Sequence, residues 1–313
     1  MNASVVIALN PHENDLEGVL EAYLHQSAPA SSFEVIVVNG GAREGAAGAY
    51  AKHRRAFPLT PVRLIEIEKH GRAAANNAGA GAARSELILF MADDFIPCTT
   101  LVRAHIEFHR HASARAVGIG PAFFVDRLRE DLFRRWLEDS GLLFGTPFRI
   151  AGNDWPQGFF YVGNASMQRS LFRELGGFDE VFDYDLADDF EFCLRLRRFG
   201  VPTHFLPKAR AWHDHEFTLA DRLEALRRSG KAARHISARH GRIAQWSTVC
   251  EQPLDDVVLA ARRAEEHDAL ASTPETRAAK FQSLLNLAFA QGFHFAAPRA
   301  AEARLASPPS RRA

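Results

Sequence analysis

Strand-like runs recur along the first hundred residues, and each is followed at once by polar residues. The runs cover 4–9, 34–38, 62–67 and 87–91. Strands buried on both faces of a sheet are rich in apolar residues, because neither face meets solvent. Segments with helical spacing or composition separate the runs, at 16–24 and 72–83. This alternation predicts an α/β fold, with a mainly parallel sheet and helices on both faces.

The rest of the chain has a less regular pattern. We expect helices at 98–112, 127–138 and 187–199, and strands at 117–124, 159–167 and 203–206. Residues 209–215 should be extended, and residues 141–158 have the composition of a loop. A capping-box pattern at Thr218 predicts a long helix. Two further helices are expected at 254–268 and 275–292.

Composition narrows the class of protein. The 38 Lys and Arg residues balance the 38 Asp and Glu residues, so no nucleic-acid partner is expected. The three cysteines are far apart and form no CxxC pair, which is typical of reduced thiols in a cytoplasmic protein. We find no signal-peptide pattern and no membrane-spanning apolar stretch. We expect a cytoplasmic protein, with peripheral membrane contact and oligomeric state left open.

Polar residues lie directly after three of the predicted strands. They are Asn10, Asn39 and the pair Asp93 and Asp94. Ligands of parallel sheets bind outside the carboxyl ends of the strands, where these residues should meet. Two carboxylates there suit a hard divalent cation that also contacts phosphate oxygens. The alternative is a strand-ending turn, in which Asp is common.

A second acidic pair and two histidines follow later. Asp188 and Asp189 open a predicted helix, where they complement the helix dipole or supply a general base. His213 and His215 lie in the extended stretch, and we expect at most one of them to face the same site as Asp94. The alternative is a pair of ordinary polar histidines near the start of a helix.

Two weaker patterns complete the candidates. His105 and His109 share one helix face, which permits a joint metal site, although packing or hydrogen bonding is the expected role. Gly71, Asn76 and Asn77 begin an Ala-rich helix that can cradle a phosphate. The motifs GxxxxGK[ST], GxSxG and HExxH are absent from the sequence, which argues against the chemistries they serve.

Taken in order, these segments resemble glycosyltransferase family two, the inverting enzymes with a GT-A fold. The resemblance covers roughly residues 3–240. Its motifs are Ser-Val-Val-Ile-Ala-Leu-Asn at 4–10, Glu-Val-Ile-Val-Val-Asn-Gly-Gly at 34–41, the stretch 71–79, the Asp-x-Asp-like segment 89–97, Gly163-Asn164, Gly-Gly-Phe-Asp-Glu at 176–180, Asp188-Asp189 with Arg195, and His213.

The resemblance implies an enzyme that moves a sugar from a nucleotide-diphosphate sugar to a hydroxyl of a saccharide or glycolipid acceptor, as in bacterial surface polysaccharide assembly. It implies a divalent metal, Mn²⁺ or Mg²⁺, held by Asp94 and His213, with Asp189 as general base beside Asp188. The implied nucleotide-sugar contacts are Ala8, Asn10, Asn39, Gly71, Asn77 and Asp93, and the implied acceptor contacts are Trp155, Gly163 and Asn164.

The same resemblance suggests a division of the chain. Residues 1–240 would form the GT-A domain, with a nucleotide-binding half at 1–97 and an acceptor half at 98–240. Residues 241–295 would form a helical extension, and residues 296–313 a disordered tail.

The sequence departs from the family pattern at several positions. Ala8 stands where Pro is usual, Asn39 and Ala92 where Asp is usual, Asn76 where Arg is usual, and Asp188 where Glu is usual. The change at residue 92 leaves Asp94 as the expected direct metal ligand, and the change at residue 39 leaves the nucleotide base open.

Three other functions remain compatible with the sequence. A nucleotidyltransferase would share the sheet and the acidic metal site, but it should carry a Gly-rich loop with a basic residue after the first strand. A non-catalytic module that binds a sugar nucleotide is the second. An interaction scaffold that docks through its C-terminal helices is the third.

Overall fold

The computed structural model describes residues 1–10, 15–40, 48, 50–51, 62–68, 71–144, 159–182, 187–243 and 248–296. Contacts divide the chain into two compact units. The first comprises Met1–Asp183 and Asp188–Glu216, and the second comprises Tyr184–Ala187 and Phe217–Ala313. The second unit therefore begins before the helix that ends at residue 240, whereas the sequence suggested a boundary after it. The expected loop at 141–158, apart from 141–144, and the expected tail beyond residue 296 lie outside the described residues.

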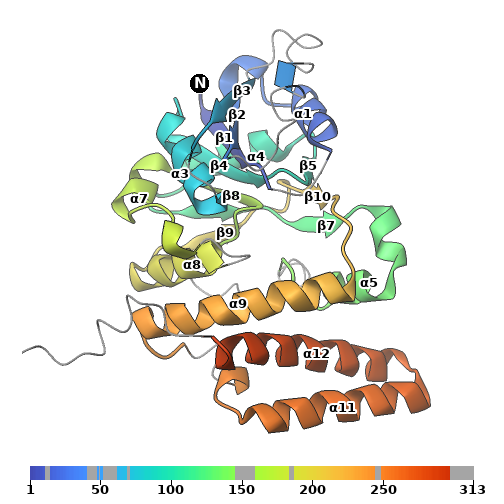
Figure 1. The fold of residues 1–313 in the computed structure, drawn as a ribbon. Coiled ribbons are helices and arrows are strands. Elements are labelled where there is room, and N and C mark those ends of the chain that lie inside the picture. The colour runs from blue at the N-terminus through green and yellow to red at the C-terminus, as the bar shows by residue number, and fades with distance from the viewer. Residues whose placement is uncertain are drawn as a thin grey trace, which may run out of the picture. The chain divides into compact units, whose positions relative to one another are not determined.

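A seven-stranded sheet forms the centre of the first unit (Figure 1). Its strand order is β3-β2-β1-β4-β8-β6-β9. The strands are β1 (Ala3–Ala8), β2 (Phe33–Asn39), β3 (Val62–Glu66), β4 (Leu87–Ala92), β6 (Val117–Ile119), β8 (Asn164–Gln168) and β9 (Thr203–Phe205). Strands β1 to β4 are parallel, and β8 runs antiparallel to β4 and β6. The expected mainly parallel sheet is confirmed.

The apolar runs form the core for the reason that the sequence suggests. Every residue of β1 and β2 is buried, as is all of β4 except its last residue. The register sets Val6 between Ile36 and Phe90, so that apolar side chains of three strands adjoin. Edge strand β3 is only partly buried, which explains why Arg63 and Glu66 interrupt its run.

The helices of the first unit pack against its strands. They are α1 (Leu16–Leu24), α3 (Arg72–Ala82), α4 (Leu101–His111), α5 (Leu132–Asp139), α7 (Arg169–Glu174) and α8 (Ala187–Arg198). Short 3-10 turns lie at Ala30–Ser32, Asp126–Glu130 and Glu180–Phe182. Asp15 caps α1 by accepting a hydrogen bond from the Gly18 amide at 2.9 Å. This confirms the predicted start of that helix.

A second, small sheet lies beside the end of β4. Its order is β5-β10-β7, with β5 at Phe95–Pro97, β7 at Ala122–Phe124 and β10 at Ala211–His213. The expected strand at 117–124 is interrupted at Gly120 and Pro121, so β6 joins the large sheet and β7 the small one. Likewise, the expected strand at 159–167 forms only from residue 164.

A turn at Gly176 and Gly177, the first two residues of the Gly-Gly-Phe-Asp-Glu motif, follows α7. Both glycines have positive φ, at 87° and 68°. A Cβ on Gly177 would lie 2.8 Å from Asn77 Oδ1. That oxygen accepts a hydrogen bond from the Phe178 amide at 2.9 Å, and the Asn77 Nδ2 donates to the Phe178 carbonyl at the same distance. The turn is thus bonded to α3.

Gly177→Ala should therefore lower the free energy of unfolding by roughly 1–3 kcal/mol, from backbone strain and the displaced Asn77 amide. Gly200→Ala is the matched control, because Gly200 has a φ of 62° but open space at its Cβ position. Urea denaturation should show a larger loss for Gly177→Ala. Equal losses would mean that the Asn77 contact contributes nothing.

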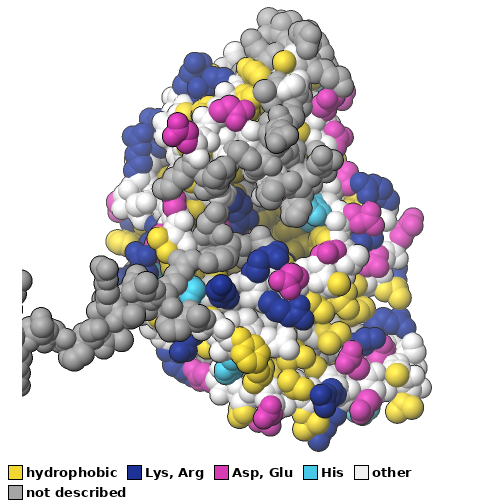
Figure 2. All heavy atoms as spheres, viewed as in Figure 1, with side chains coloured by type: hydrophobic (Ala, Val, Ile, Leu, Met, Phe, Trp, Pro, Cys, Tyr) yellow, Lys and Arg dark blue, Asp and Glu magenta, His cyan; other side chains and the backbone are white. Residues whose placement is uncertain are grey.

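The second unit is helical. It contains α9 (Leu219–His240), α11 (Leu254–Ala271) and α12 (Pro274–His294), and the capping box predicted at Thr218 is present. Lys and Arg side chains gather over α9 on the face shown in Figure 2. Among the described residues, no helix is both long enough and apolar enough to cross a membrane.

Candidate functional site

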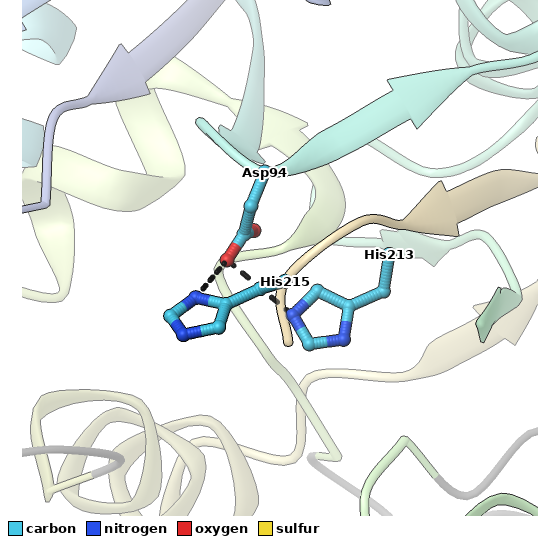
Figure 3. A group of neighbouring side chains, drawn as sticks. All are labelled: Asp94, His213 and His215. Carbon is cyan, nitrogen blue, oxygen red and sulfur yellow. Dashed lines mark ion pairs between the residues drawn. The ribbon is translucent and has the colours of Figure 1, made fainter. Parts of the chain in front are cut away.

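Asp94 occupies the turn between β4 and β5, where the two sheets adjoin. Strand β10 pairs with β5 so that His213 is opposite Phe95, and the Asp214 amide donates to the Asp94 carbonyl at 2.8 Å. These backbone bonds place both histidines of the His-x-His segment beside the carboxylate (Figure 3). Asp94 Oδ2 lies 3.3 Å from His213 Nε2 and 3.4 Å from His215 Nδ1.

The expectation that at most one of the two histidines faces Asp94 was wrong. Side chains two residues apart in an extended chain lie on the same side, because the side-chain period is two. The strand ends at His213, and His215 follows in the extended chain beyond it. His215 therefore joins Asp94 and His213 in one cluster.

Aromatic rings surround the inner histidine. The centroids of Phe95, Phe124 and Phe144 lie 5.1, 5.3 and 5.3 Å from that of His213. Asp94 is 7% exposed and His213 is 8% exposed. Burial by itself raises the pKa of Asp94, but His213 and His215 together hold it well below its usual range. The carboxylate is thus kept ionised in an apolar setting.

The cluster fits a divalent cation. One ligand atom from each of Asp94, His213 and His215 lies within 4.8 Å of the others. The buried Asp94 Oδ1 makes no hydrogen bond within the described residues, and an unsatisfied carboxylate oxygen is costly unless a cation or solvent reaches it. Two imidazoles beside one carboxylate favour Mn²⁺ over Mg²⁺, which prefers oxygen ligands.

His215→Ala should weaken Mn²⁺ binding by roughly 10–100-fold or more, because residues that only support a metal ligand already contribute that much. Isothermal titration with Mn²⁺ measures this directly. His111→Ala, at the exposed end of α4, is the control and should bind like the wild type. Unchanged affinity in His215→Ala would exclude that ring as a ligand.

Asp93, the residue before Asp94, joins the end of β4 to the chain that follows β1. Its carboxylate accepts hydrogen bonds from the Asn10 amide at 3.0 Å and from Asn10 Nδ2 at 2.8 Å. Asp93 is fully buried. Asn10, two residues after β1, is thus bonded to the residue after β4, as expected for the carboxyl edge of a parallel sheet.

The second acidic pair lies in the first turn of α8. Both oxygens of Asp188 contact the Arg72 guanidinium, with Arg72 Nε 3.1 Å from Oδ2 and Nη2 bonded to Oδ1. Asp189 Oδ2 accepts a hydrogen bond from the Val162 amide at 3.3 Å. Its Oδ1 lies 3.4 Å from Arg72 Nη2 and makes no hydrogen bond within the described chain.

Burial has the largest effect on the pKa of Asp189. It raises the pKa of this carboxyl to about 7, opposed by Arg72 and assisted by the charge of Asp188. A general base works best when its pKa lies near the working pH. Asp189 therefore has the acidity of a proton acceptor at neutral pH, whereas Asp188 is bound in an ion pair.

The segment before β8 connects the two clusters. The Val162 amide donates a hydrogen bond to Asp189. The carbonyl of the following residue, Gly163, accepts a hydrogen bond from the Ala92 amide at 3.4 Å. Ala92 is the last residue of β4, two positions before Asp94. Gly163 also packs against the Phe95 ring, which lies 2.8 Å from where its Cβ would be. The structure thus brings the acidic pair and the Asp-His-His cluster to one edge of the sheet.

Other residues proposed to contact the nucleotide sugar have mixed placements. Ala8 and Asn39 are buried at the ends of β1 and β2, and Gly71 precedes α3 with a φ of 110°. Asn77 instead bonds the Gly177–Phe178 turn and Glu180 Oε1. Its described contacts are structural, and its proposed role stays a prediction.

Asn164, one of the proposed acceptor contacts, makes hydrogen bonds within the protein. Asn164 is fully buried. Its side-chain Nδ2 donates to the Ala209 carbonyl at 2.7 Å, and its Oδ1 lies 2.9 Å from His105 Nε2. These contacts are structural. Trp155 lies outside the described residues.

The histidine pair on α4 has the hydrogen-bonding role expected of it. His105 Nδ1 and His109 Nε2 contact Ser166 Oγ at 2.7 and 2.9 Å. Burial lowers the pKa of His105 to about 3 and that of His109 to about 4, so both rings are neutral. Both rings thus connect α4 to β8 through Ser166.

The sequence left His215 out of the implied metal ligands and gave no role to Arg72. The spacing of His215 from His213 was a usable signal, because it places both rings on one side of an extended chain. Arg72 is one helical turn before Asn76, where the family pattern has Arg. Residues four apart share a helix face, so a basic side chain at the start of α3 could have been considered.

Comparison with known proteins supports the fold and the enzyme class. The model of the family described as "Glycosyl transferase family 2" matches residues 4–176. Validoxylamine A glucosyltransferase of Streptomyces hygroscopicus subsp. limoneus is 23% identical over 220 residues, which cover 64% of this chain and 48% of the relative. Glycosyltransferase AglE of Haloferax volcanii is 29% identical over 94 residues, covering 30% of this chain and 31% of that one. The chain spans about half the length of the validoxylamine glucosyltransferases it matches.

Solved structures show the same fold. The mannosyltransferase PcManGT of Pyrobaculum calidifontis, in complex with GDP-Man and Mn²⁺, aligns with a TM-score of 0.66 at 18% identity, covering 94% of this chain and 87% of that one. TarS 1–349 of S. aureus in complex with UDP-GlcNAc aligns with a TM-score of 0.52 at 14% identity, covering 94% and 91%. Asp188, Asp189, His213 and His215 all lie beyond the range that the family model matches.

Proposed function

This chain belongs to glycosyl transferase family 2, and from that premise we propose that it transfers a hexose or related sugar from a nucleotide-diphosphate sugar to a hydroxyl group. Its sheet and flanking helices form the GT-A arrangement that the sequence resemblance implied. The sugar-transferring enzymes among its relatives and structural neighbours support the reaction class.

The observation that carries the proposal is the pairing of two unlike clusters at one sheet edge. Asp94, His213 and His215 have the donor set of a divalent-cation site. Asp189 has a buried carboxylate oxygen without a hydrogen bond in the described structure. Both kinds of group serve transfer from a nucleotide-diphosphate sugar, because negative charge leaves from one side of the anomeric carbon while a proton leaves the acceptor on the other.

Asp189 and the Asp94, His213 and His215 cluster have separate roles in this reaction. Asp189 Oδ1 accepts the proton of the acceptor hydroxyl while the acceptor oxygen forms its bond to the anomeric carbon. The bond from that carbon to the phosphate oxygen breaks, and its electron pair leaves with the nucleoside diphosphate. A divalent cation held by Asp94, His213 and His215, Mn²⁺ by preference, would stabilise the charge on that leaving group.

Several finer features belong to the proposal. A single displacement with one base inverts the anomeric configuration. The acceptor is a saccharide or a glycolipid, and polysaccharide assembly is the process that suits such a product. A cytoplasmic location with peripheral membrane contact agrees with this role. The nucleotide-sugar contacts of Ala8, Asn10, Asn39, Gly71, Asn77 and Asp93, and the acceptor contacts of Trp155, Gly163 and Asn164, stay predictions.

A thermal-shift screen tests donor recognition. UDP, GDP, ADP and CDP are each added with and without Mn²⁺. One of them should raise the melting temperature by several degrees with Mn²⁺ present, since saturation at a hundredfold excess over Kd stabilises by about 2.7 kcal/mol. The stabilisation should be smaller with Mg²⁺ and smallest with a chelator.

Transfer itself is then measured with the sugar form of the nucleotide that binds, over a panel of saccharide and lipid-linked acceptors. Release of nucleoside diphosphate that depends on the acceptor supports the proposal. Donor binding without turnover would favour a binding module. Formation of a sugar nucleotide from a sugar 1-phosphate and a nucleoside triphosphate would favour a nucleotidyltransferase.

A further inference from the structure

The guanidinium of Arg72 bridges the two carboxylates at the start of α8. Arg72 is the first residue of α3, far from α8 in the chain, and its side chain is 26% exposed. It contacts both oxygens of Asp188 and lies 3.4 Å from Asp189 Oδ1. Neither the metal-type cluster nor the proton-transfer step described above assigns it a role.

We propose that Arg72 is a positioning residue for sugar transfer, which binds Asp188 in a two-point ion pair and so orients Asp189 with Oδ1 available to the acceptor hydroxyl. This inference rests on the proposed function. Arg72 acts through the two aspartates and does not itself touch the reacting atoms.

The geometry explains why one carboxylate is fixed and the other available. A guanidinium presents its N–H groups in a rigid plane, and two of them bind the two oxygens of Asp188. Asp188 is 1% exposed, so its carboxylate is shielded from water, whereas the Arg72 side chain is 26% exposed. Asp189 is held on its other side, where the Val162 amide donates to Oδ2. One acceptor atom of the pair, Asp189 Oδ1, is left for chemistry.

Charge gives a second reason for the arrangement. Two adjacent buried carboxylates repel each other, and one of them would take up a proton unless a cation intervened. The titratable groups that act on Asp189 are Arg72 from α3 and Asp188 and Cys193 from α8. Burial raises the pKa of the Cys193 thiol to about 12, so it stays neutral, and it donates to the Phe160 carbonyl at 3.2 Å. Arg72 is therefore the cation that lowers the pKa of Asp189 against the effects of burial and of Asp188.

The test compares the pH dependence of kcat/KM in Arg72→Gln and Arg72→Lys. Arg72→Gln removes the charge, so the rising limb of the profile should move upward by roughly 1–3 pH units, the usual effect of an adjacent Arg on an Asp. At pH 7 transfer should fall by about 10–10³-fold and recover as the pH is raised. Arg72→Lys keeps the charge but cannot bind both oxygens in one plane, so its limb should stay in place while kcat falls.

Arg115→Gln is the matched control. Arg115 pairs with Glu174 at 2.7 Å on the exposed surface, and its loss should leave both the rate and the profile unchanged. An unmoved limb in Arg72→Gln would overturn the proposal. A rise in donor KM at unchanged kcat would also overturn it, because Arg72 would then be a donor ligand.

A measurement without substrate separates this inference from the proposed function. The infrared band of the protonated Asp189 carboxyl, identified by its absence in Asp189→Asn, is followed against pH in the wild type and both Arg72 variants. Arg72→Gln should keep the carboxyl protonated to higher pH even if no sugar transfer is ever detected. Identical titrations in the wild type and Arg72→Gln would refute the inference. Arg72→Met, which also removes the charge, replaces Arg72→Gln if that variant fails to fold.

Discussion

Asp189→Asn should reduce sugar transfer by about 10²–10⁴-fold while donor binding stays intact, because the variant loses the proton acceptor and keeps the shape of the side chain. Single-turnover rates and a thermal-shift titration with the nucleotide diphosphate measure the two properties separately. Asp139→Asn, at a side chain that is 63% exposed, is the control and should behave like the wild type. Undiminished transfer in Asp189→Asn would exclude Asp189 as the base.

The pKa of Asp189 adds a pH dependence to this expectation. The ionised form accepts the proton, so wild-type kcat/KM should rise as the pH increases through about 7 and level off above it. The sign is opposite for stability. Because burial holds the folded-state pKa above the unfolded value, the ionisation of Asp189 costs stability increasingly as pH rises from about 4 to 7. Asp189→Asn should lack the rising limb in whatever activity remains.

Asp94→Asn should reduce both Mn²⁺ affinity and transfer, the latter by roughly 10²–10⁴-fold, since charge stabilisation by a bound cation contributes several kcal/mol. Asn keeps one oxygen but carries no charge, and the two histidines lose the anion that adjoins them. Titration calorimetry with Mn²⁺ and transfer assays with and without a chelator give the two readouts.

The chelator provides the internal control for this variant. It should depress the wild-type rate to near that of Asp94→Asn and change the variant little further. Asp126→Asn, which replaces an exposed aspartate, should respond to the chelator as the wild type does. If Asp94→Asn kept full Mn²⁺ dependence, the cation would be held elsewhere.

The fold was largely predictable because burial on both faces leaves a direct mark on sequence. The runs that became β1, β2 and β4 contain few polar residues, and their partners in the sheet follow from the alternation with helices. Helix starts at Asp15 and Thr218 were predictable from local capping chemistry. These features depend on near neighbours in the chain.

Features that depend on distant pairing were harder to predict. The short strands β5, β7 and β10 have three residues each, too few to show a period, and they form a sheet only with one another. The bonding of Asn77 and Asn164 to distant carbonyl groups likewise has no local signature. The grouping of α9 with the C-terminal helices depends on helix contacts that a capping motif does not specify.

The environments of the two side chains in the acidic pair were also hard to predict from the sequence. Its position at a helix start was visible in the sequence, but the different environments of Asp188 and Asp189 were not. Arg72 comes from another part of the chain, and the Val162 amide from a third. Only their convergence distinguishes an ion-paired carboxylate from one with an available oxygen.

The pairing of β5 with β10 also bears on the order of folding, because it brings the cation-site residues together. Asp94 and His213 are far apart in the chain, and closing so long a loop costs entropy before any contact is gained. The unfolded chain therefore has no preformed cation site, and a cation would bind only after β10 has docked beside β5. Its binding free energy would then add to that of docking. The supply of divalent cation would thus set how tightly β10 docks beside β5.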